Sequence, residues 1–158
     1  MIIVGIDPGR KGAVAILYST PTSWNISAYE MPYVARDIDV PRLCGLLNGW
    51  LDEMEVWIER VHSMPGQGVA STFAFGVGFG VILGVIQAME LPMHLVAPQT
   101  WKAEILRDTD KSKEAAIEHV MQTYPGVDLL QGRRKPHDGM ADAICIAEYG
   151  LRKRGKHE

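Results

Sequence analysis

Four carboxylates, far apart in the chain, are the residues whose types could do chemistry together. Asp7 and Glu59 each end a short apolar run, and Asp138 and Asp142 are four residues apart. A spacing of four places two side chains on one face of a helix. Hard oxygen ligands suit Mg²⁺ or Mn²⁺, whereas zinc favours histidine and cysteine clusters, which this sequence lacks. Two such ions about 4 Å apart can activate a water and stabilise the leaving oxygen of a phosphoryl displacement, which is nuclease chemistry.

Each of these acids also has a purely structural interpretation. Asp7 precedes Pro8 and Gly9 and could be an ordinary turn residue. Asp138 could cap a helix, and Asp142 could face solvent. However, the five residues after Asp142 are apolar, and a carboxylate at the edge of a buried segment needs a partner. The catalytic interpretation therefore depends on the four acids meeting.

The predicted strands and helices bring Asp7 and Glu59 to one place. After the first strand, residues 12–18 and 24–30 read as strands joined by short links, which predicts antiparallel hairpins. Apolar residues at helical spacing predict a helix over 37–50, followed by a strand over 55–59. A helical crossover makes this strand parallel to the first, so both acids are expected at one sheet edge.

The rest of the chain alternates helices and a strand. A fifth strand is predicted over 92–97, and helices over 98–106, over 111–124 and from about His137 or Asp138 onward. Three hairpin-linked strands followed by alternating helices and strands predict an α/β fold with a sheet of mixed direction.

The stretch from Val69 to Met89 is apolar and about long enough to span a membrane. Gly76, Gly80 and Gly84 recur at the small-residue spacing that lets helices approach closely. Polar residues interrupt the stretch, flanking lysines and arginines are missing, and two predicted strands enclose it. We therefore expect a helix buried between the sheet and another helix, such as a partner subunit's, and no membrane association.

Length and composition describe an ordinary soluble domain. The 158 residues fit one domain, 1–158, with 47% hydrophobic and 22% charged residues. A net charge of -3 argues against a protein coated in positive charge but allows a local basic face. Cys44 and Cys145 are too far apart to suggest a disulfide framework, and no signal-peptide pattern opens the chain. These features favour the cytoplasm.

Three segments resemble the signatures of the RuvC-type Holliday junction resolvases of the RNase H-like superfamily: Gly5–Gly9, Ile58–Val61 and Ala141–Ala147. The similarity continues in order over nearly the whole chain, and residues 64–68 and 137–139 are most similar to phage and prophage versions. The resemblance implies an RNase H-like five-stranded sheet, with three antiparallel strands followed by two parallel strands and helices on both faces. We expect a basic C-terminal tail over about 151–158.

The resemblance also implies a function. Such a protein is a homodimer in a bacterial or phage-infected cell that binds four-way DNA junctions, with forks as further candidates. It nicks two strands symmetrically and leaves 5′-phosphate and 3′-hydroxyl ends. By resemblance, Asp7, Glu59, Asp138 and Asp142 hold two Mg²⁺ ions, for which Mn²⁺ can substitute. Cellular members usually place the third ligand three residues before the last acid, where this chain has Gly139. Asp138 is our choice, and His137 is the alternative.

Basic residues complete the site that the resemblance implies. Lys102, Lys111 and Lys113 match basic positions of the family, and a lysine near the metals can steady the transition state; we assign this catalytic role to Lys111. His62 stands where cellular members often have an aromatic that wedges into the junction. Ordinary solvated surface charge is the alternative for each. The residues expected to contact DNA are His62, Gln67, Lys102, Lys111, Lys113, Arg133, Arg134 and Lys135.

Two other functions compete with the nuclease. The chain could bind branched DNA with a decayed metal site, but all four acids are present. The Gly5–Gly9 turn also resembles that of ATP-using sugar kinases and chaperone-like proteins. Those folds need two such domains to enclose a nucleotide, and 158 residues cannot supply both. The nuclease interpretation is therefore the leading hypothesis.

Overall fold

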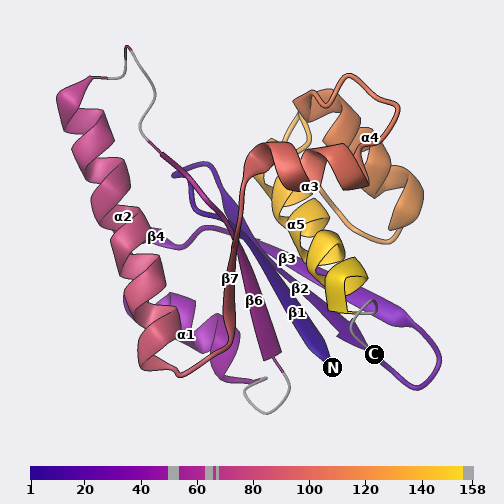
Figure 1. Ribbon diagram of the computed structural model, residues 1–158, viewed down its shortest axis with the longest axis horizontal. Coiled ribbons are helices and arrows are strands. Elements are labelled where there is room, and N and C mark those ends of the chain that lie inside the picture. Colours follow the sequence, from indigo (N-terminus) through magenta and orange to yellow (C-terminus); the bar gives the residue numbers. More distant parts are fainter. Residues whose placement is uncertain (50–53, 63–65, 67, 155–158) are drawn as a thin grey trace.

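The computed structural model describes residues 1–49, 54–62, 66 and 68–154, and a sheet of five strands lies at its centre (Figure 1). The sheet order is β3-β2-β1-β6-β7. β1 (Ile2–Asp7), β2 (Ala13–Ser19) and β3 (Trp24–Glu30) are antiparallel neighbours. β6 (Met54–Glu59) lies parallel to β1, and β7 (Met93–Val96) lies parallel to β6. The predicted mixed sheet is confirmed.

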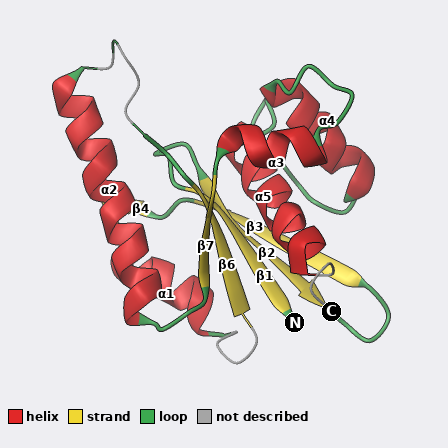
Figure 2. Cartoon of the chain, viewed as in Figure 1, coloured by secondary structure: helices red, strands yellow, loops and turns green. Residues whose placement is uncertain are grey.

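Helices cover both faces of the sheet, as predicted (Figure 2). α1 (Val40–Asn48) and α2 (Val69–Ala88) lie on one face. α3 (Pro98–Ile105), α4 (Lys113–Thr123) and α5 (Asp138–Arg154) lie on the other. Each face has its own apolar core. Since β1 and β2 are central, their side chains alternate between the two cores, which explains why both strands are almost wholly buried.

Two predicted helices begin later than expected. The segment from Asp37 opens as β5 (Asp37–Ile38), which pairs with β4 (Tyr33–Val34) in a short antiparallel ribbon. α1 then starts after Asp39, whose side chain accepts a hydrogen bond from the backbone N–H of Arg42. The predicted end of this helix at Trp50 lies outside the described residues.

α4 begins at Lys113 rather than Lys111. Ser112 is its N-cap, and the serine hydroxyl accepts a hydrogen bond from the N–H of Ala115 at 3.2 Å. Lys111 lies in the preceding loop with a left-handed φ of 58°. Lys113 is therefore in the first turn of α4, whereas Lys111 is outside the helix.

α5 lies directly on the sheet because glycines remove side chains at the contact. A Cβ on Gly5 would lie 2.1 Å from the carbonyl oxygen of Ala143, and one on Gly139 would lie 2.1 Å from that of Lys11. No side chain fits in such a gap. The N-terminal part of α5 is thereby held against β1 and against the turn that follows it.

Within this chain α2 is buried only in part, and the partner helix expected to cover the rest stays a prediction. Ile82, Val85 and Ile86 of its C-terminal part pack into the core, whereas Phe73, nearer its start, is 73% exposed. In Figure 1 the N-terminal half of α2 stands clear of the sheet. Among the described residues, α2 is the one helix long and apolar enough to cross a membrane, by length and composition.

Candidate active site

Asp7 and Glu59 lie at the same edge of the sheet, as predicted. β1 and β6 are parallel neighbours, and Ile6 pairs with Ile58, so the acids that follow come next in register. Side chains alternate along a strand. Gly5 contacts α5, and Trp57 packs in the core on the α5 side of the sheet. Asp7 is two residues after Gly5, and Glu59 is two residues after Trp57, so both acids face that side. The strand pairing thus directs both carboxylates toward α5.

The contact at Gly139 brings the helix acids to the same edge. Asp138 is the first residue of α5, and the Gly139 contact with Lys11 fixes it next to the turn after β1. Asp142 lies one turn later, beside the Ala143 carbonyl that covers Gly5. All four acids are close enough to interact electrostatically: Asp142 is influenced by the charges of Asp7, Glu59 and Asp138.

The packing of Gly139 gives a physical reason why the third acid is at position 138 and not at position 139. Any side chain at position 139 would collide with the backbone of Lys11. The turn between β1 and β2 therefore excludes an acid three residues before Asp142, whereas Asp138, four residues before it, remains on the accessible side of the helix. The two spacings share a helix face, so the carboxylate still reaches the site.

Burial and mutual repulsion make Asp7 and Asp142 hard to ionise. Burial raises the pKa of Asp7 to about 6; a hydrogen bond from the N–H of Gly9 opposes this, and Glu59 and Asp138 add to it. Burial raises the pKa of Asp142 to about 7; Lys102 opposes this, and the other acids add to it. The Oδ1 atom of Asp142 is buried and has no hydrogen-bond partner among the described residues. Such an oxygen is unusual unless a ligand meets it.

Trp101 holds Glu59, a contact that the sequence did not reveal. The fully buried indole donates a hydrogen bond from Nε1 to Glu59 Oε2 at 2.8 Å. Burial raises the pKa of Glu59, while this hydrogen bond and the charge of Lys102 lower it. The ammonium of Lys102 lies 5.2 Å from the centroid of the Trp101 ring. α3 thus supplies both an orienting donor and a cation, and a tryptophan next to a lysine at a helix start was the available signal.

Of the three lysines predicted at the site, Lys113 is the one that forms an ion pair with one of the four acids. It forms an ion pair with Asp138. Burial alone would raise the pKa of Asp138, but the hydrogen bond and charge of Lys113 outweigh it and lower this pKa. Lys111 is exposed, and its backbone N–H donates to Thr109. The structure therefore brings Lys102 and Lys113 to the acids and leaves Lys111 in the loop before α4.

His137 has a structural task at the start of α5. Its buried ring accepts a hydrogen bond at Nδ1 from the N–H of Met140 at 3.1 Å, and the backbone N–H of His137 donates to the carbonyl of Leu129 at 2.8 Å. One ring nitrogen is thus engaged in capping the helix. This arrangement favours Asp138 over His137 as the third ligand.

The four acids fit a divalent cation by their chemistry. Within the described ranges, no three His, Cys, Asp or Glu side chains are drawn together tightly enough to enclose an ion. The four acids nevertheless offer hard oxygen donors, including the unpaired buried Oδ1 of Asp142. The ammonium of Lys113 already neutralises Asp138. A cation would relieve the repulsion that raises the pKa of both Asp7 and Asp142.

The residues predicted to contact DNA differ in whether they are already ion-paired and in whether they lie within the described residues. His62 is exposed in the loop after β6, and Gln67 lies outside the described residues. Arg134 and Lys135 are exposed, whereas Arg133 forms an ion pair with Glu30 at the end of β3.

The predicted C-terminal tail begins as helix. Its residues 151–154 form the last turn of α5, and 155–158 lie outside the described residues. Arg152, Lys153 and Arg154 are ion-paired with Glu148, Glu104 and Glu55.

Comparisons with known proteins agree with the fold. No family model matches the chain. It is 26% identical over 156 residues to the crossover junction endodeoxyribonuclease RuvC of Porphyromonas gingivalis, covering 91% of this chain and 80% of the relative.

Solved structures extend this similarity. Thermus thermophilus RuvC in complex with a Holliday junction substrate superimposes with a TM-score of 0.69 at 17% identity, over 99% of this chain and 96% of that one. The yeast mitochondrial Holliday junction resolvase Ydc2 gives a TM-score of 0.64 at 17% identity, over 98% and 80%. The resemblance found in the motifs is therefore confirmed, and the chain has the RNase H-like fold of the RuvC-type Holliday junction resolvases.

Proposed function

We propose that this protein is a divalent-metal-dependent endonuclease that nicks branched DNA and resolves four-way junctions by paired incisions. The observation that carries the proposal is the convergence of Asp7, Glu59, Asp138 and Asp142, from β1, β6 and α5, at one sheet edge. The similarity to a crossover junction endodeoxyribonuclease supports it. A neighbour in fold that was solved with a Holliday junction substrate gives further support.

The four acids would hold two Mg²⁺ ions, or Mn²⁺ in their place. When bound, the ions supply an activated water and charge stabilisation for in-line displacement at phosphorus. The protein's part is to fix the ligands beforehand. Trp101 orients the carboxylate of Glu59, and the N–H of Gly9 orients that of Asp7. Preset donors of this kind lower the cost of assembling the site.

Lys102 and Lys113 would meet the phosphate. Both ammonium groups lie close enough to the acids for the lysines and the acids to interact electrostatically. Lys113 pairs with Asp138 in this structure, and when Asp138 serves as a ligand, the ammonium becomes available to a phosphate oxygen. Positive charge next to a developing phosphorane stabilises the transition state. We therefore propose Lys113, in addition to Lys111, as a candidate for the catalytic lysine.

Paired incision requires two sites, and α2 offers a surface on which two copies can meet. Val69, Phe73 and Val77 are exposed on its N-terminal half, at 88%, 73% and 46%. A Cβ on Gly76 or Gly80 would meet nothing within 4 Å among the described residues, so these glycines leave room for a close helix contact. Apolar surface of this kind marks interaction sites. We propose a two-fold symmetric dimer through α2, which matches the two-fold symmetry of paired cuts.

Cleavage of a set of end-labelled DNAs tests the function. The protein is incubated with a four-way junction, a fork and a linear duplex, in Mg²⁺, in Mn²⁺ and in EDTA, and cuts are mapped on every strand. We expect nicks at matching positions on two opposed strands of the junction, with 5′-phosphate ends, and none in EDTA. A junction complex that forms without nicks in either metal would instead identify a DNA-binding protein with a decayed site.

A further inference from the structure

A groove rich in cations begins at Asp138, where the acid site ends. Its walls are the turn after β1, which carries Arg10 and Lys11, and the loop over 128–137, which carries Arg134 and Lys135. The cavity between them has a volume of about 670 Å³ and reaches Asp138. A second cavity, of about 490 Å³, continues from it along Arg10 toward α1. We call the first cavity, with these four cations, the basic groove.

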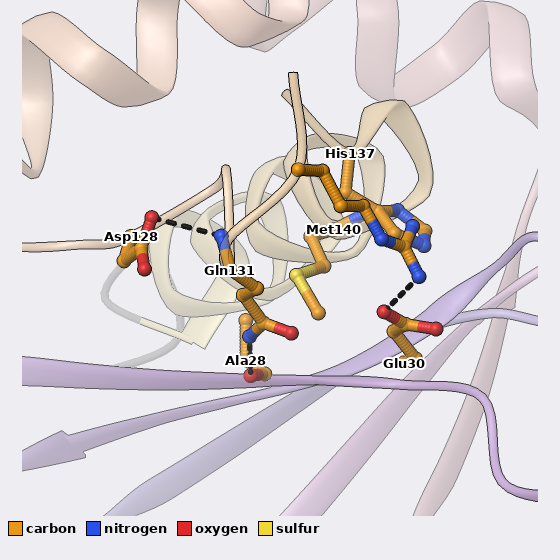
Figure 3. Close-up of polar contacts among 7 residues, drawn as sticks. Ala28, Glu30, Asp128, Gln131, His137 and Met140 are labelled. Carbon is orange, nitrogen blue, oxygen red and sulfur yellow. Dashed lines mark hydrogen bonds and ion pairs between the residues drawn. The ribbon is translucent and has the colours of Figure 1, made fainter. Parts of the chain in front are cut away.

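The loop over 128–137 is held in place by hydrogen bonds and by a buried leucine. Asp128 Oδ1 accepts hydrogen bonds from the N–H groups of Leu130 and Gln131 at 2.9 and 3.0 Å. Figure 3 shows the bond from Gln131 and the bond that the Gln131 amide donates to the carbonyl of Ala28 in β3. Leu129 is buried in the core. The loop backbone is therefore tied to β3 and to the start of α5, and it presents Arg134 and Lys135 from a fixed position.

One arginine of this loop has a different role from its neighbour. The Arg133 guanidinium forms an ion pair with the carboxylate of Glu30, the last residue of β3, and both side chains line the groove. Among the described residues, Lys11, Arg134 and Lys135 show no ion pair. The Arg133–Glu30 ion pair thus links the loop to the end of β3, whereas Lys11, Arg134 and Lys135 remain available to bind a ligand.

Arg10 is partly engaged but has donors to spare. Its guanidinium donates one hydrogen bond to the carbonyl of Ala35 at 3.1 Å and lies 5.7 Å from the centroid of the Tyr33 ring. A guanidinium carries five N–H donors, so this orientation leaves several free. The β4–β5 ribbon therefore fixes the direction of Arg10 along the groove.

We propose that the basic groove binds consecutive backbone phosphates of the DNA strand that continues from the acid site, through Arg10, Lys11, Arg134 and Lys135. The assignment of this strand as the one that is cut rests on the function proposed above, but the phosphate contacts do not. A protein of net charge -3 that concentrates four cations in one open groove is built to attract a polyanion locally. The groove is open and leads to Asp138, which fits a passing strand better than an enclosed small molecule.

The salt dependence of junction binding tests this proposal. Affinity for a labelled four-way junction is measured in EDTA between about 50 and 200 mM salt. The slope of log affinity against log salt is negative, and each lost phosphate contact makes it less steep by about 0.9. We expect this loss for Lys11→Gln and for Arg134→Gln. The control is Arg107→Gln, which removes an exposed cation outside the groove and should keep the wild-type slope.

The outcomes separate this proposal from the nuclease. Unchanged slopes for both Lys11→Gln and Arg134→Gln, or an equal loss for Arg107→Gln, would overturn the groove assignment whether or not the protein cleaves. Binding in EDTA needs no cleavage, so a wild type that never nicks DNA would refute the nuclease alone. Arg10→Gln is left out of the decisive set because Arg10 also supports the β4–β5 ribbon. Urea unfolding of each variant confirms that the comparison is between folded proteins.

Discussion

Replacing Asp142 by asparagine should stabilise the metal-free protein at alkaline pH. Burial raises the pKa of Asp142 from its ordinary 3.8 to about 7, so above pH 7 the folded chain must hold a charge that the unfolded chain keeps in water. Between these two values the folded state binds more protons than the unfolded state. The free energy of unfolding therefore falls as pH rises from about 4 to 7, and the full loss is present above pH 7.

The size of the effect follows from this shift. Each pKa unit corresponds to about 1.4 kcal/mol, so an ionised Asp142 costs on the order of 4 kcal/mol at pH 8. Asparagine keeps the shape and removes the charge, but it leaves an amide in place of an oxygen that already lacks a partner, at a cost of about 1–3 kcal/mol. We expect a net gain of about 2 kcal/mol at pH 8. At pH 5 ionisation of the unfolded chain destabilises the wild type by only about 1.6 kcal/mol, which the cost of the amide offsets, so the gain should vanish.

Urea unfolding in EDTA at pH 5 and pH 8 measures this difference. Asp37→Asn, at an exposed acid of the β4–β5 ribbon, is the matched control and should behave alike at both pH values. Adding Mg²⁺ at pH 8 should stabilise the wild type more than Asp142→Asn, because the variant has lost one ligand charge. A difference between wild type and Asp142→Asn that does not change with pH would refute the claim that a buried, repelled carboxylate sits at this position.

Three further variants test separate parts of the structure. Gly5→Ala places a Cβ 2.1 Å from the carbonyl of Ala143 and should cost roughly 3 kcal/mol or more in urea unfolding; wild-type stability would show that α5 does not lie on β1 as described. Phe73→Glu should give a monomer by light scattering with an unchanged free energy of unfolding, and a dimer that persists would exclude this half of α2 from the interface. Trp101→Phe removes the hydrogen bond that lowers the pKa of Glu59, so the acidic limb of the cleavage pH profile should move to higher pH; an unmoved profile would show that the indole does not tune this carboxylate.

The sheet and its acidic edge could be predicted because the information is local. Apolar runs mark the strands, and each acid stands at the end of its run, so a parallel crossover is enough to bring Asp7 and Glu59 together. The i, i+4 spacing of Asp138 and Asp142 likewise needs only helical geometry. The similarity of residues 64–68 and 137–139 to phage versions stays a prediction.

The partners of these acids could not be predicted, because they depend on packing between distant segments. Trp101 reaches Glu59 only because α3 follows the neighbouring strand β7. Lys113 rather than Lys111 reaches Asp138 because Ser112 sets the start of α4. The sequence shows lysines two residues apart, but the cap decides which of them meets α5.

Two further features could not be predicted from the sequence: the exposure of the N-terminal half of α2 and the ion pairs of the last turn of α5. Apolar composition predicted a buried helix, but composition does not say which molecule buries it, and within this chain Phe73 stays exposed. Arg152, Lys153 and Arg154 look like a free basic cluster in the sequence, yet the fold brings an acid to each. Charge in a sequence shows where cations are, and only the tertiary structure shows which of them are already paired.

The most direct test of the metal-dependent nuclease is the cleavage rate of Asp7→Asn on a four-way junction, with enzyme in excess and binding saturated. Asparagine keeps the size of Asp7 and its place after β1 but removes the charge that a cation needs. We predict junction affinity equal to that of the wild type and an incision rate in Mg²⁺ lowered by at least about 100-fold. An Asp7→Asn protein that binds and nicks the junction at the wild-type rate would contradict the assignment of the four carboxylates as the catalytic centre.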